Sequence, residues 1–291
     1  MKTVSIIGAS GLIGARLLTT LRAHQAGAVL ASGTRWRSPG HRELKPLDAT
    51  DPEALRAHLG QGFDWVFVAA GTKDVARCQA EPAYARALNA TPIATVAAIV
   101  ARERLPTRLV YLSTDQVFDG ERGLYREDEA PSPRTRYGES KAEGEAAVLA
   151  SGAHLVVRTG AVMARGGRFF DWLLASLARP GEVSLYEDCW FSPTPLQLLC
   201  DVVAGVLCGR AEPQGGVVHV VGERRMSRLE LGRAIAGLVP TTRGTLVPMA
   251  RPGGDPLVPR DVSLVPSPVV ARLARRPLDQ YLADEVRGVA G

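Results

Sequence analysis

The chain has 291 residues, of which 46% are hydrophobic and 22% charged, as in a globular protein of one large domain or one and a half. Its apolar runs are too short to span a bilayer. Glycines interrupt the apolar N-terminal stretch, which argues against a signal peptide. The four cysteines form no paired motif and no ligand-like cluster with histidine, as expected for buried thiols in the reducing cytoplasm.

The net charge of +5 and the isoelectric point near 9.2 do not indicate nucleic-acid binding. Only four of the 35 basic residues are lysines, a composition typical of a GC-rich coding bias. Acidic residues are spread among the basic ones, and no basic run is interleaved with aromatic residues. We therefore expect a small-molecule substrate as the partner, with neither nucleic acid nor membrane.

Strands and helices alternate through the first 160 residues. Strands are expected at 3–7, 28–31, near 47, and at 65–70, 108–112 and 154–157, and helices at 12–24, from 52, and at 82–102 and 137–150. A capping residue, Pro52 and Glu53 mark the start of the second helix. This alternation predicts an α/β fold with a doubly wound parallel sheet.

The pattern loosens after residue 160, where proline and glycine become frequent. Helices are expected near 169–178, 196–207 and 228–238, a strand at 217–221, and an amphipathic closing helix over 265–291. These features predict a cofactor-binding domain over 1–160 and a smaller C-terminal α/β substrate lobe over 161–291. Part of 183–221 is expected to return to the main sheet.

A glycine-rich turn, G-x-x-G-x-x-G, follows the first strand and opens the first helix. Small residues let the backbone approach a pyrophosphate, whose charge lies over the helix N-terminus. Chance alone yields about 0.3 copies of the string, so its placement after the first strand gives it weight. A tight turn without a ligand is the alternative. The predicted cofactor contacts here are Gly8, Ser10, Gly11, Leu12, Ile13 and Gly14.

The second expected strand indicates which dinucleotide binds. NAD proteins usually place an acid about 20 residues after the turn, on the ribose 2′-hydroxyl. Residues 32–37 contain no acid, and Arg35 and Arg37 offer guanidinium groups to a 2′-phosphate. NADPH is therefore favoured over NADH. Asp48 either accepts a hydrogen bond from the adenine amino group or is a loop acid or secondary cap.

Tyr137 and Lys141 are spaced i and i+4, on one face of a helix. Chance gives about 0.08 copies of this pair in a chain with so few lysines. Thr114 ends the fifth strand, at the sheet edge where doubly wound folds bind ligands. Reduction of a ketone leaves an alkoxide that needs a proton, and a nearby ammonium lowers the pKa of a phenol towards the working range. Thr114, Tyr137 and Lys141 are the predicted catalytic residues, against the alternative of an exposed helical pair.

These motifs resemble the extended short-chain dehydrogenase/reductase superfamily, and most closely the dTDP-4-dehydrorhamnose reductase family, which includes the β regulatory subunit of methionine adenosyltransferase. The resemblance covers most of the chain and is loose over the last 60 or so residues. The matching strings are 4–14, 69–72, 88–90, 113–120, 125–128, 137–141, 144–145 and 192–194.

The resemblance implies a Rossmann domain, an NADPH-type cofactor, the catalytic triad named above and a sugar-nucleotide 4-ketone as substrate. It also implies cofactor contacts at Ala69, Ala70, Gly71 and Lys141, and a homodimer formed through helices near 92–104 and 137–150. The chain departs from the rhamnose enzymes at Gly71, Ala76, Gln79, Gln116 and 258–260. These departures put the rhamnose pathway in question, while the reductase chemistry stands.

Three functions compete at this point. The first is an NADPH-dependent ketoreductase acting on a nucleotide-linked deoxysugar, and the second a reductase of another small carbonyl compound. The third is a cofactor-binding regulatory subunit. Trp190 and Phe191 either pack between the lobes, the favoured interpretation, or stack on a nucleobase.

Overall fold

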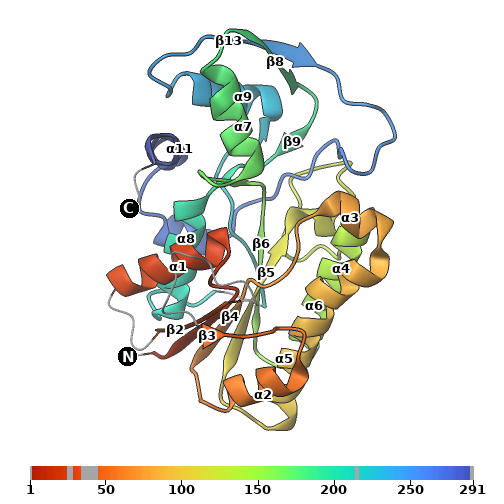
Figure 1. Ribbon diagram of the computed structural model, residues 1–291, viewed down its shortest axis with the longest axis vertical. Coiled ribbons are helices and arrows are strands. Elements are labelled where there is room, and N and C mark those ends of the chain that lie inside the picture. Colours follow the sequence, from red (N-terminus) through yellow and green to blue (C-terminus); the bar gives the residue numbers. More distant parts are fainter. Residues whose placement is uncertain (1, 25–28, 34–44, 214–215, 289–291) are drawn as a thin grey trace.

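The computed structural model describes residues 2–24, 29–33, 45–213 and 216–288. The chain forms a large lobe around a central sheet and a smaller lobe at one end of it (Figure 1). Among the described residues, no helix has the length and apolar character needed to cross a bilayer.

The large lobe is built on a central sheet, in which the described residues form seven strands. Its strands are β1 (Val4–Ile7), β2 (Val29–Gly33), β3 (Lys45–Pro46), β4 (Trp65–Val68), β5 (Arg108–Thr114), β6 (Leu155–Thr159) and β11 (Val217–His219). All pair in parallel, in the order β11-β6-β5-β4-β1-β2-β3. The predicted doubly wound parallel sheet is therefore confirmed, and its order reverses between β1 and β4, where such folds bind ligands.

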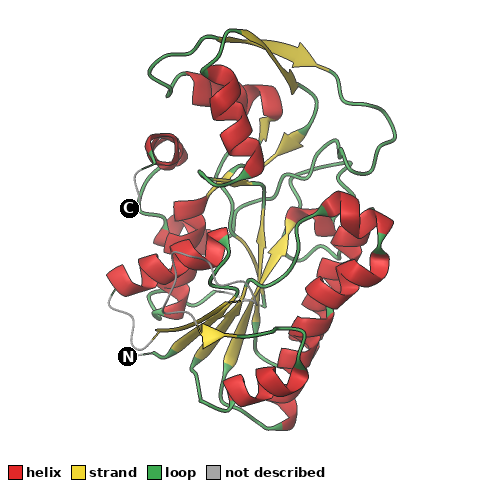
Figure 2. Ribbon diagram, viewed as in Figure 1, coloured by secondary structure: helices red, strands yellow, loops and turns green. Residues whose placement is uncertain are grey.

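Helices cover both faces of the sheet (Figure 2). One face carries α1 (Leu12–Ala23), α8 (Leu196–Leu207) and α10 (Pro268–Leu273), and the other carries α2 (Pro52–Leu59), α5 (Thr91–Arg102) and α6 (Arg136–Ala150). Strand β4 shows why: Trp65 and Phe67 enter one core while Val66 and Val68 enter the other. A strand that is apolar on both sides requires cover on both sides.

The smaller lobe has a hydrophobic core of its own. It contains α7 (Arg168–Leu177), β8 (Gly181–Tyr186), α9 (Arg228–Ala236), β13 (Gly244–Met249), α11 (Leu278–Arg287) and the short strands β7 (Val162–Met163), β9 (Trp190–Phe191), β10 (Thr194–Pro195) and β12 (Met226–Ser227). Strands β8 and β13 pair in parallel over six residues. Between these segments the chain returns to the large lobe, where α8 packs on α1 and β11 extends the main sheet.

Two segments that are each predicted to form one continuous helix form two helices instead. The expected helix over 82–102 is two helices, α4 (Pro82–Asn89) and α5, and a further helix, α3 (Val75–Ala80), precedes them. Pro92 lies in the first turn of α5 and has no backbone N–H. The series of i→i−4 helical hydrogen bonds therefore cannot continue from α4 into α5. At the end of α4, the carbonyl oxygen of Asn89 accepts a hydrogen bond from the Tyr111 hydroxyl at 2.8 Å. Likewise, Pro277 separates α10 from α11 in the closing segment.

Candidate functional site

A cavity of about 500 Å³ opens at the carboxyl ends of β1, β4, β5 and β6. The glycine-rich turn lines one side of it, and Thr114, Tyr137 and Lys141 line another. Residues that lie far apart in the chain, from β1 to α6, therefore meet at the edge of the sheet that the sequence predicts.

The glycine-rich turn brings backbone close to backbone. Gly8 has a φ of +98°, and a Cβ there would lie 2.7 Å from the backbone nitrogen of Ala70. A Cβ on Gly14 would lie 2.3 Å from the carbonyl oxygen of Gly8. Helix α1 begins without a side-chain cap and without an acid in its first turn. Its first N–H groups thus remain available to an anion in the cavity.

Thr114 lies at the end of β5 and is buried. Its Oγ1 donates to Oδ1 of Asp115 at 3.0 Å and accepts from the backbone N–H of Gln116 at 3.3 Å. The Tyr137 phenol lies close enough to this hydroxyl for hydrogen bonding between the two to affect the pKa of the phenol. Thr114 caps the short 3₁₀ turn that follows, η1 (Asp115–Val117), and lines the first cavity.

Helix α6 carries Tyr137 and Lys141, and Thr135 caps its start by accepting from the N–H of Gly138. Lys141 is 7% exposed. Its Nζ donates to the carbonyl oxygen of Leu112 at 2.6 Å and lies 4.0 Å from the centre of the Tyr111 ring. The ammonium is thus held against β5, just behind Thr114.

Burial dominates the protonation of these groups. It lowers the pKa of Lys141 to about 7, an effect opposed by the negative charge of Glu145. It raises the pKa of Tyr137 well above its usual value; the Thr114 hydrogen bond opposes this rise and the charge of Asp115 adds to it. The sequence predicts that Lys141 brings the pKa of Tyr137 down towards the working range, whereas in this structure the net shift is upward, because burial is its largest cause.

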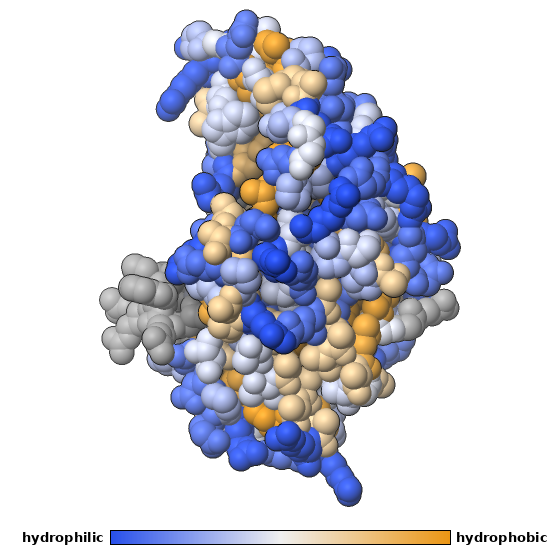
Figure 3. All heavy atoms as spheres, turned by 90° about the vertical axis from the view of Figure 1, so that its right-hand side faces the viewer, coloured by the Kyte–Doolittle hydropathy of each residue, from blue (hydrophilic) through white to orange (hydrophobic). Residues whose placement is uncertain are grey.

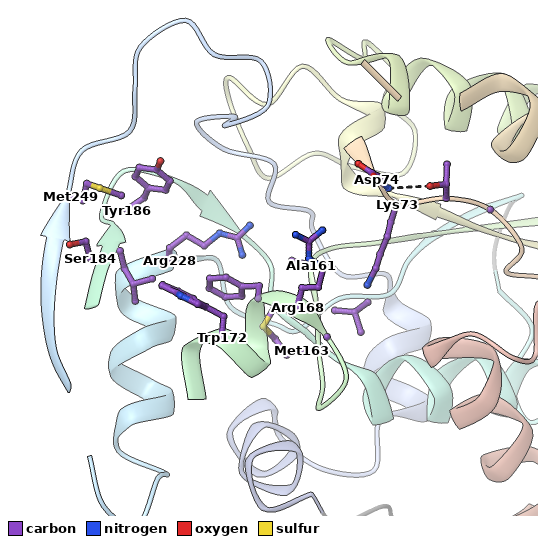
Figure 4. Close-up of a pocket in the computed structure, with 16 residues that line it drawn as sticks. Lys73, Asp74, Ala161, Met163, Arg168, Trp172, Ser184, Tyr186, Arg228 and Met249 are labelled. Atoms are coloured by element: carbon purple, nitrogen blue, oxygen red, sulfur yellow. Dashed lines mark hydrogen bonds between the residues drawn. The ribbon is translucent and has the colours of Figure 1, made fainter. Parts of the chain in front are cut away.

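A second cavity, of about 940 Å³, adjoins the first and reaches into the smaller lobe. Three cations extend towards it, Lys73, Arg168 and Arg228 (Figure 4). None of the three forms an ion pair with a carboxylate in the described parts of the chain. Asp74, the acid on this wall, accepts from the N–H of Arg77 as the cap of α3. The cavity is therefore electropositive, and sequence reasoning missed it because nothing distinguishes these arginines from the many others.

Arg228 has a defined place at the junction of the cavities, since it lines both of them. Its guanidinium lies 4.0 Å from the ring centre of Phe191 and 4.8 Å from that of Phe169. Burial lowers its pKa, an effect opposed by the charge of Asp115. Planar stacking of this kind fixes the orientation of a guanidinium and leaves its N–H groups for a ligand.

Comparisons with known proteins agree with this arrangement. The chain matches the RmlD substrate binding domain family over residues 1–283. The chain belongs to the dTDP-4-dehydrorhamnose reductase family of extended short-chain dehydrogenases/reductases. It is 33% identical to a dTDP-4-dehydrorhamnose reductase of Mycobacterium tuberculosis, over 79% of this chain and 73% of that one. It is 30% identical to a probable dTDP-4,6-dihydroxy-2-methyloxan-3-one 4-ketoreductase of Streptomyces antibioticus, over 84% and 79%.

Solved structures of the family share the fold. A hypothetical dTDP-4-dehydrorhamnose reductase of Sulfolobus tokodaii is 27% identical and superposes with a TM-score of 0.80, covering 94% of this chain and 95% of that one. A dTDP-4-dehydrorhamnose reductase of Bacillus anthracis, solved in complex with NADP, is 21% identical with a TM-score of 0.80, covering 99% of each. The latter likeness supports the fold.

The remaining predicted site residues lie in several places. Ala69, Ala70 and Gly71 line the first cavity, as does Gln116. Asp48 does not line it; its Oδ1 accepts from the backbone N–H and the hydroxyl of Thr50, as a loop acid does. Ser10 lies in the turn but is not part of the cavity wall. Arg35 and Arg37 lie outside the described residues.

The positions at which this member departs from the rhamnose enzymes divide into two groups. Gly71, Gln116 and Pro259 face the first cavity. Ala76 and Gln79 lie on α3, away from both cavities, and Gln79 accepts from the backbone N–H of Arg136 at 3.1 Å. The differences at these three positions therefore change the lining of the first cavity.

The aromatic pair before β10 does not offer a stacking surface. Phe191 is 1% exposed and belongs to the core of the smaller lobe. Trp190 is covered by the guanidinium of Arg225, 3.9 Å from its ring centre. The favoured interpretation, packing between the lobes, is correct that Phe191 packs, but its ring packs in the core of the smaller lobe. The rings that do reach the second cavity are Phe169, Trp172 and Tyr186.

Proposed function

We propose that the protein is an NADPH-dependent ketoreductase acting on a nucleotide-linked deoxysugar with a 4-keto group. The observation that carries the proposal is the convergence of Thr114, Tyr137 and Lys141 on a cavity that also contains the glycine-rich turn. The named relatives include dTDP-4-dehydrorhamnose reductases and a probable dTDP-sugar 4-ketoreductase, which supports the reaction and the substrate class. Reductase action requires both a dinucleotide and an acid at one site.

The first cavity fits a dinucleotide. The close approach at Gly8 and Gly14 and the uncapped start of α1 suit a pyrophosphate. Deeper in, Oγ1 of Thr159 is buried at the end of β6 and has no hydrogen-bond partner among the described residues. A hydroxyl of this kind suits an amide group such as that of nicotinamide. When bound, the reduced nicotinamide supplies a hydride to the carbonyl carbon of the substrate.

The triad supplies the proton. Thr114 and Tyr137 both line the cavity; Tyr137 can donate a hydrogen bond to a ketone oxygen there, and Thr114 can do so once its hydroxyl proton turns away from Asp115. As that oxygen gains negative charge, Tyr137 transfers its phenolic proton to it. The phenolate left behind is costly in a buried site, so it needs the Thr114 hydroxyl and the Lys141 ammonium. Lys141 therefore has to be charged during turnover.

The second cavity is suited to the nucleotide part of the substrate. Lys73, Arg168 and Arg228 provide positive charge for a diphosphate, and Arg228 reaches both cavities. Phe169, Trp172 and Tyr186 provide aromatic surface for a base, and Trp172 is 46% exposed. A sugar placed between the two ends would lie beside the triad.

The test is oxidation of NADPH by the purified protein, across a panel of nucleotide-linked 4-keto-6-deoxysugars. Loss of reduced-nicotinamide absorbance, without any added partner, is the expected result. No turnover, together with a stoichiometric partner whose activity changes on binding, would point to a regulatory subunit instead. The closing segment does not favour that alternative, because Leu278, Tyr281 and Leu282 of α11 are buried in the chain itself.

The cofactor preference has its own test. Fluorescence titration should give tighter binding of NADPH than of NADH, because Arg35 and Arg37 stand where an acid would hold a 2′-hydroxyl. Arg35→Asp should shift the preference towards NADH. Equal or tighter binding of NADH by the unaltered chain would contradict the assignment.

We also propose a homodimer formed through α5 and α6. Figure 3 looks onto this side of the molecule, where apolar side chains lie among polar ones in the lower half. Leu149, on α6, is 41% exposed.

A further inference from the structure

Glu145 forms a buried junction beneath the triad. Its carboxylate accepts from Ser113 Oγ at 2.5 Å, and from Nε and Nη2 of Arg158 at 3.1 and 2.8 Å. The side chains of Glu145 and Arg158 are both 2% exposed. Ser113 precedes Thr114 on β5, Arg158 precedes Thr159 on β6, and Glu145 follows Lys141 by one turn of α6. One carboxylate therefore connects the three elements that carry the site.

The mechanism does not use this carboxylate directly, yet its charge acts on Lys141. The hydrogen-bond acceptor and the ring beside the Lys141 ammonium, the Leu112 carbonyl and Tyr111, are uncharged. Burial favours the neutral amine, and Glu145 is the charged group that opposes this effect. A buried anion one helical turn away stabilises an ammonium far more than it would in water.

The other titratable groups around the site leave this role to Glu145. Tyr137 and Tyr111 are kept neutral, because burial raises the pKa of each. Cys78, on α3 near Tyr137, likewise has its thiol pKa raised by burial. Asp115, on η1, faces Tyr137 and Arg228. His219, on β11 beyond Arg158, is kept neutral at pH 7 because burial and Arg158 lower its pKa to about 4.

We propose that Glu145 is a positioning residue that keeps Lys141 in its ammonium form, with Ser113 and Arg158 orienting its carboxylate. The inference deepens the proposed reductase function, on which its catalytic meaning rests. The charge relation between Glu145 and Lys141 can be measured without a substrate. Failure of the proposed Glu145–Lys141 relation is therefore distinguishable from failure of the proposed reductase function.

The experiment is a lysine NMR titration. The chain has four lysines, Lys2, Lys45, Lys73 and Lys141, so a protein labelled with 13C-lysine gives few signals, and Lys141→Met assigns the one of interest. Glu145→Gln should lower the pKa of Lys141 by about one unit or more. Glu143→Gln is the matched control: Glu143 lies on the same helix, is exposed and pairs with Arg86, so its loss should leave Lys141 unchanged.

Glu145→Gln leaves Arg158 buried without its partner and can prevent folding. The double variant Glu145→Gln with Arg158→Gln removes both charges; because loss of the Arg158 cation opposes loss of the Glu145 anion, it should lower the pKa of Lys141 by less than the single variant does. Glu145→Asp keeps the charge and should restore the value towards that of the unaltered chain. An unchanged Lys141 pKa in either neutral variant overturns the proposal. A lowered pKa in a protein that reduces no keto-sugar would uphold the charge relation and reject the proposed function.

Discussion

Burial has opposite consequences for the two titratable residues of the triad. It keeps Tyr137 protonated at any physiological pH, so the proton that a general acid must donate is always present. It brings the pKa of Lys141 down to about 7, so the charge that must stabilise the phenolate is present only part of the time. Asp115, whose pKa burial raises to about 6, is mostly ionised at pH 7. Near pH 7, the protonation state of Lys141 therefore determines whether the phenolate of Tyr137 can be stabilised.

Removal of the phenol tests the assignment of the acid. Tyr137→Phe should cut turnover by about 10²–10⁴, the usual contribution of general acid catalysis. NADPH affinity, measured by fluorescence titration, should be nearly unchanged, because Thr159, Lys141 and the glycine-rich turn remain. Near-normal turnover in this variant would show that another group donates the proton.

The rate of reduction should fall above neutral pH. A lowered lysine pKa means that the ammonium is complete below about pH 7 and is lost as the pH rises through that value. We expect kcat/KM for the keto-sugar to decrease about tenfold per pH unit on the basic side. Lys141→Arg, which stays charged throughout, should lack this decrease, whatever its absolute rate. A flat profile of the unaltered enzyme up to pH 9 would contradict the dependence on Lys141.

At the scale of the elements, the sequence predicts a helix, strand or turn correctly where residue spacing and hydrophobicity within that segment determine its structure. The glycine-rich turn, the Tyr137–Lys141 helix and the β4 strand follow from spacing and hydrophobicity, and the structure contains all three. The break before α5 was missed because the apolar periodicity of 82–102 runs through it, while Pro92 ends the ladder.

Other features depend on contacts that no local pattern encodes. Strands β8 and β13 pair across more than 50 residues, and their mixed burial hides the pairing. The second cavity depends in the same way on tertiary structure, since Lys73, Arg168 and Arg228 come from three separate segments. The effect of burial on Tyr137 was also beyond the sequence, because it depends on the walls that other elements supply.

The close contact in the glycine-rich turn predicts a sharp effect of one methyl group. Gly14→Ala places a Cβ 2.3 Å from the carbonyl oxygen of Gly8, so the turn has to open. A cost of about 1–3 kcal/mol is typical of overpacking, and NADPH affinity should fall at least about tenfold. Thermal melting and fluorescence titration measure the two effects.

Gly237, at the end of α9, provides a control for the Gly14 substitution. Gly237 has a φ of −68°, and a Cβ there would find its nearest contact at 3.6 Å. Gly237→Ala should therefore change neither the melting temperature nor NADPH binding appreciably. Equal losses in both variants would mean that Gly14 is not under special constraint.

At the scale of the whole molecule, the two lobes contribute differently to the two adjoining cavities, one proposed for the dinucleotide and one for the nucleotide part of the substrate. The sheet and the glycine-rich turn of the large lobe form most of the first cavity, whereas segments of the smaller lobe, among them β7, α7 and β8, form most of the second. Each lobe has its own core, and α8 and β11 tie the second half of the chain back into the first. In our proposal a dinucleotide needs one lobe and a nucleotide sugar needs both.

Arg228 is where this division can be tested, since it comes from the smaller lobe and reaches both cavities. Arg228→Gln removes the charge and the stacked plane, and should raise KM for the nucleotide-linked substrate about tenfold or more, the scale of a lost charged hydrogen bond. NADPH affinity should be unchanged. Arg228→Lys keeps the charge without the planar guanidinium, so its KM should lie between those of the unaltered enzyme and Arg228→Gln. Arg233→Gln, an exposed arginine on the same helix, is the matched control and should have no effect. If Arg228→Gln instead weakened NADPH binding as much as substrate binding, this arginine would serve the cofactor, and the nucleotide of the substrate would have to be held elsewhere.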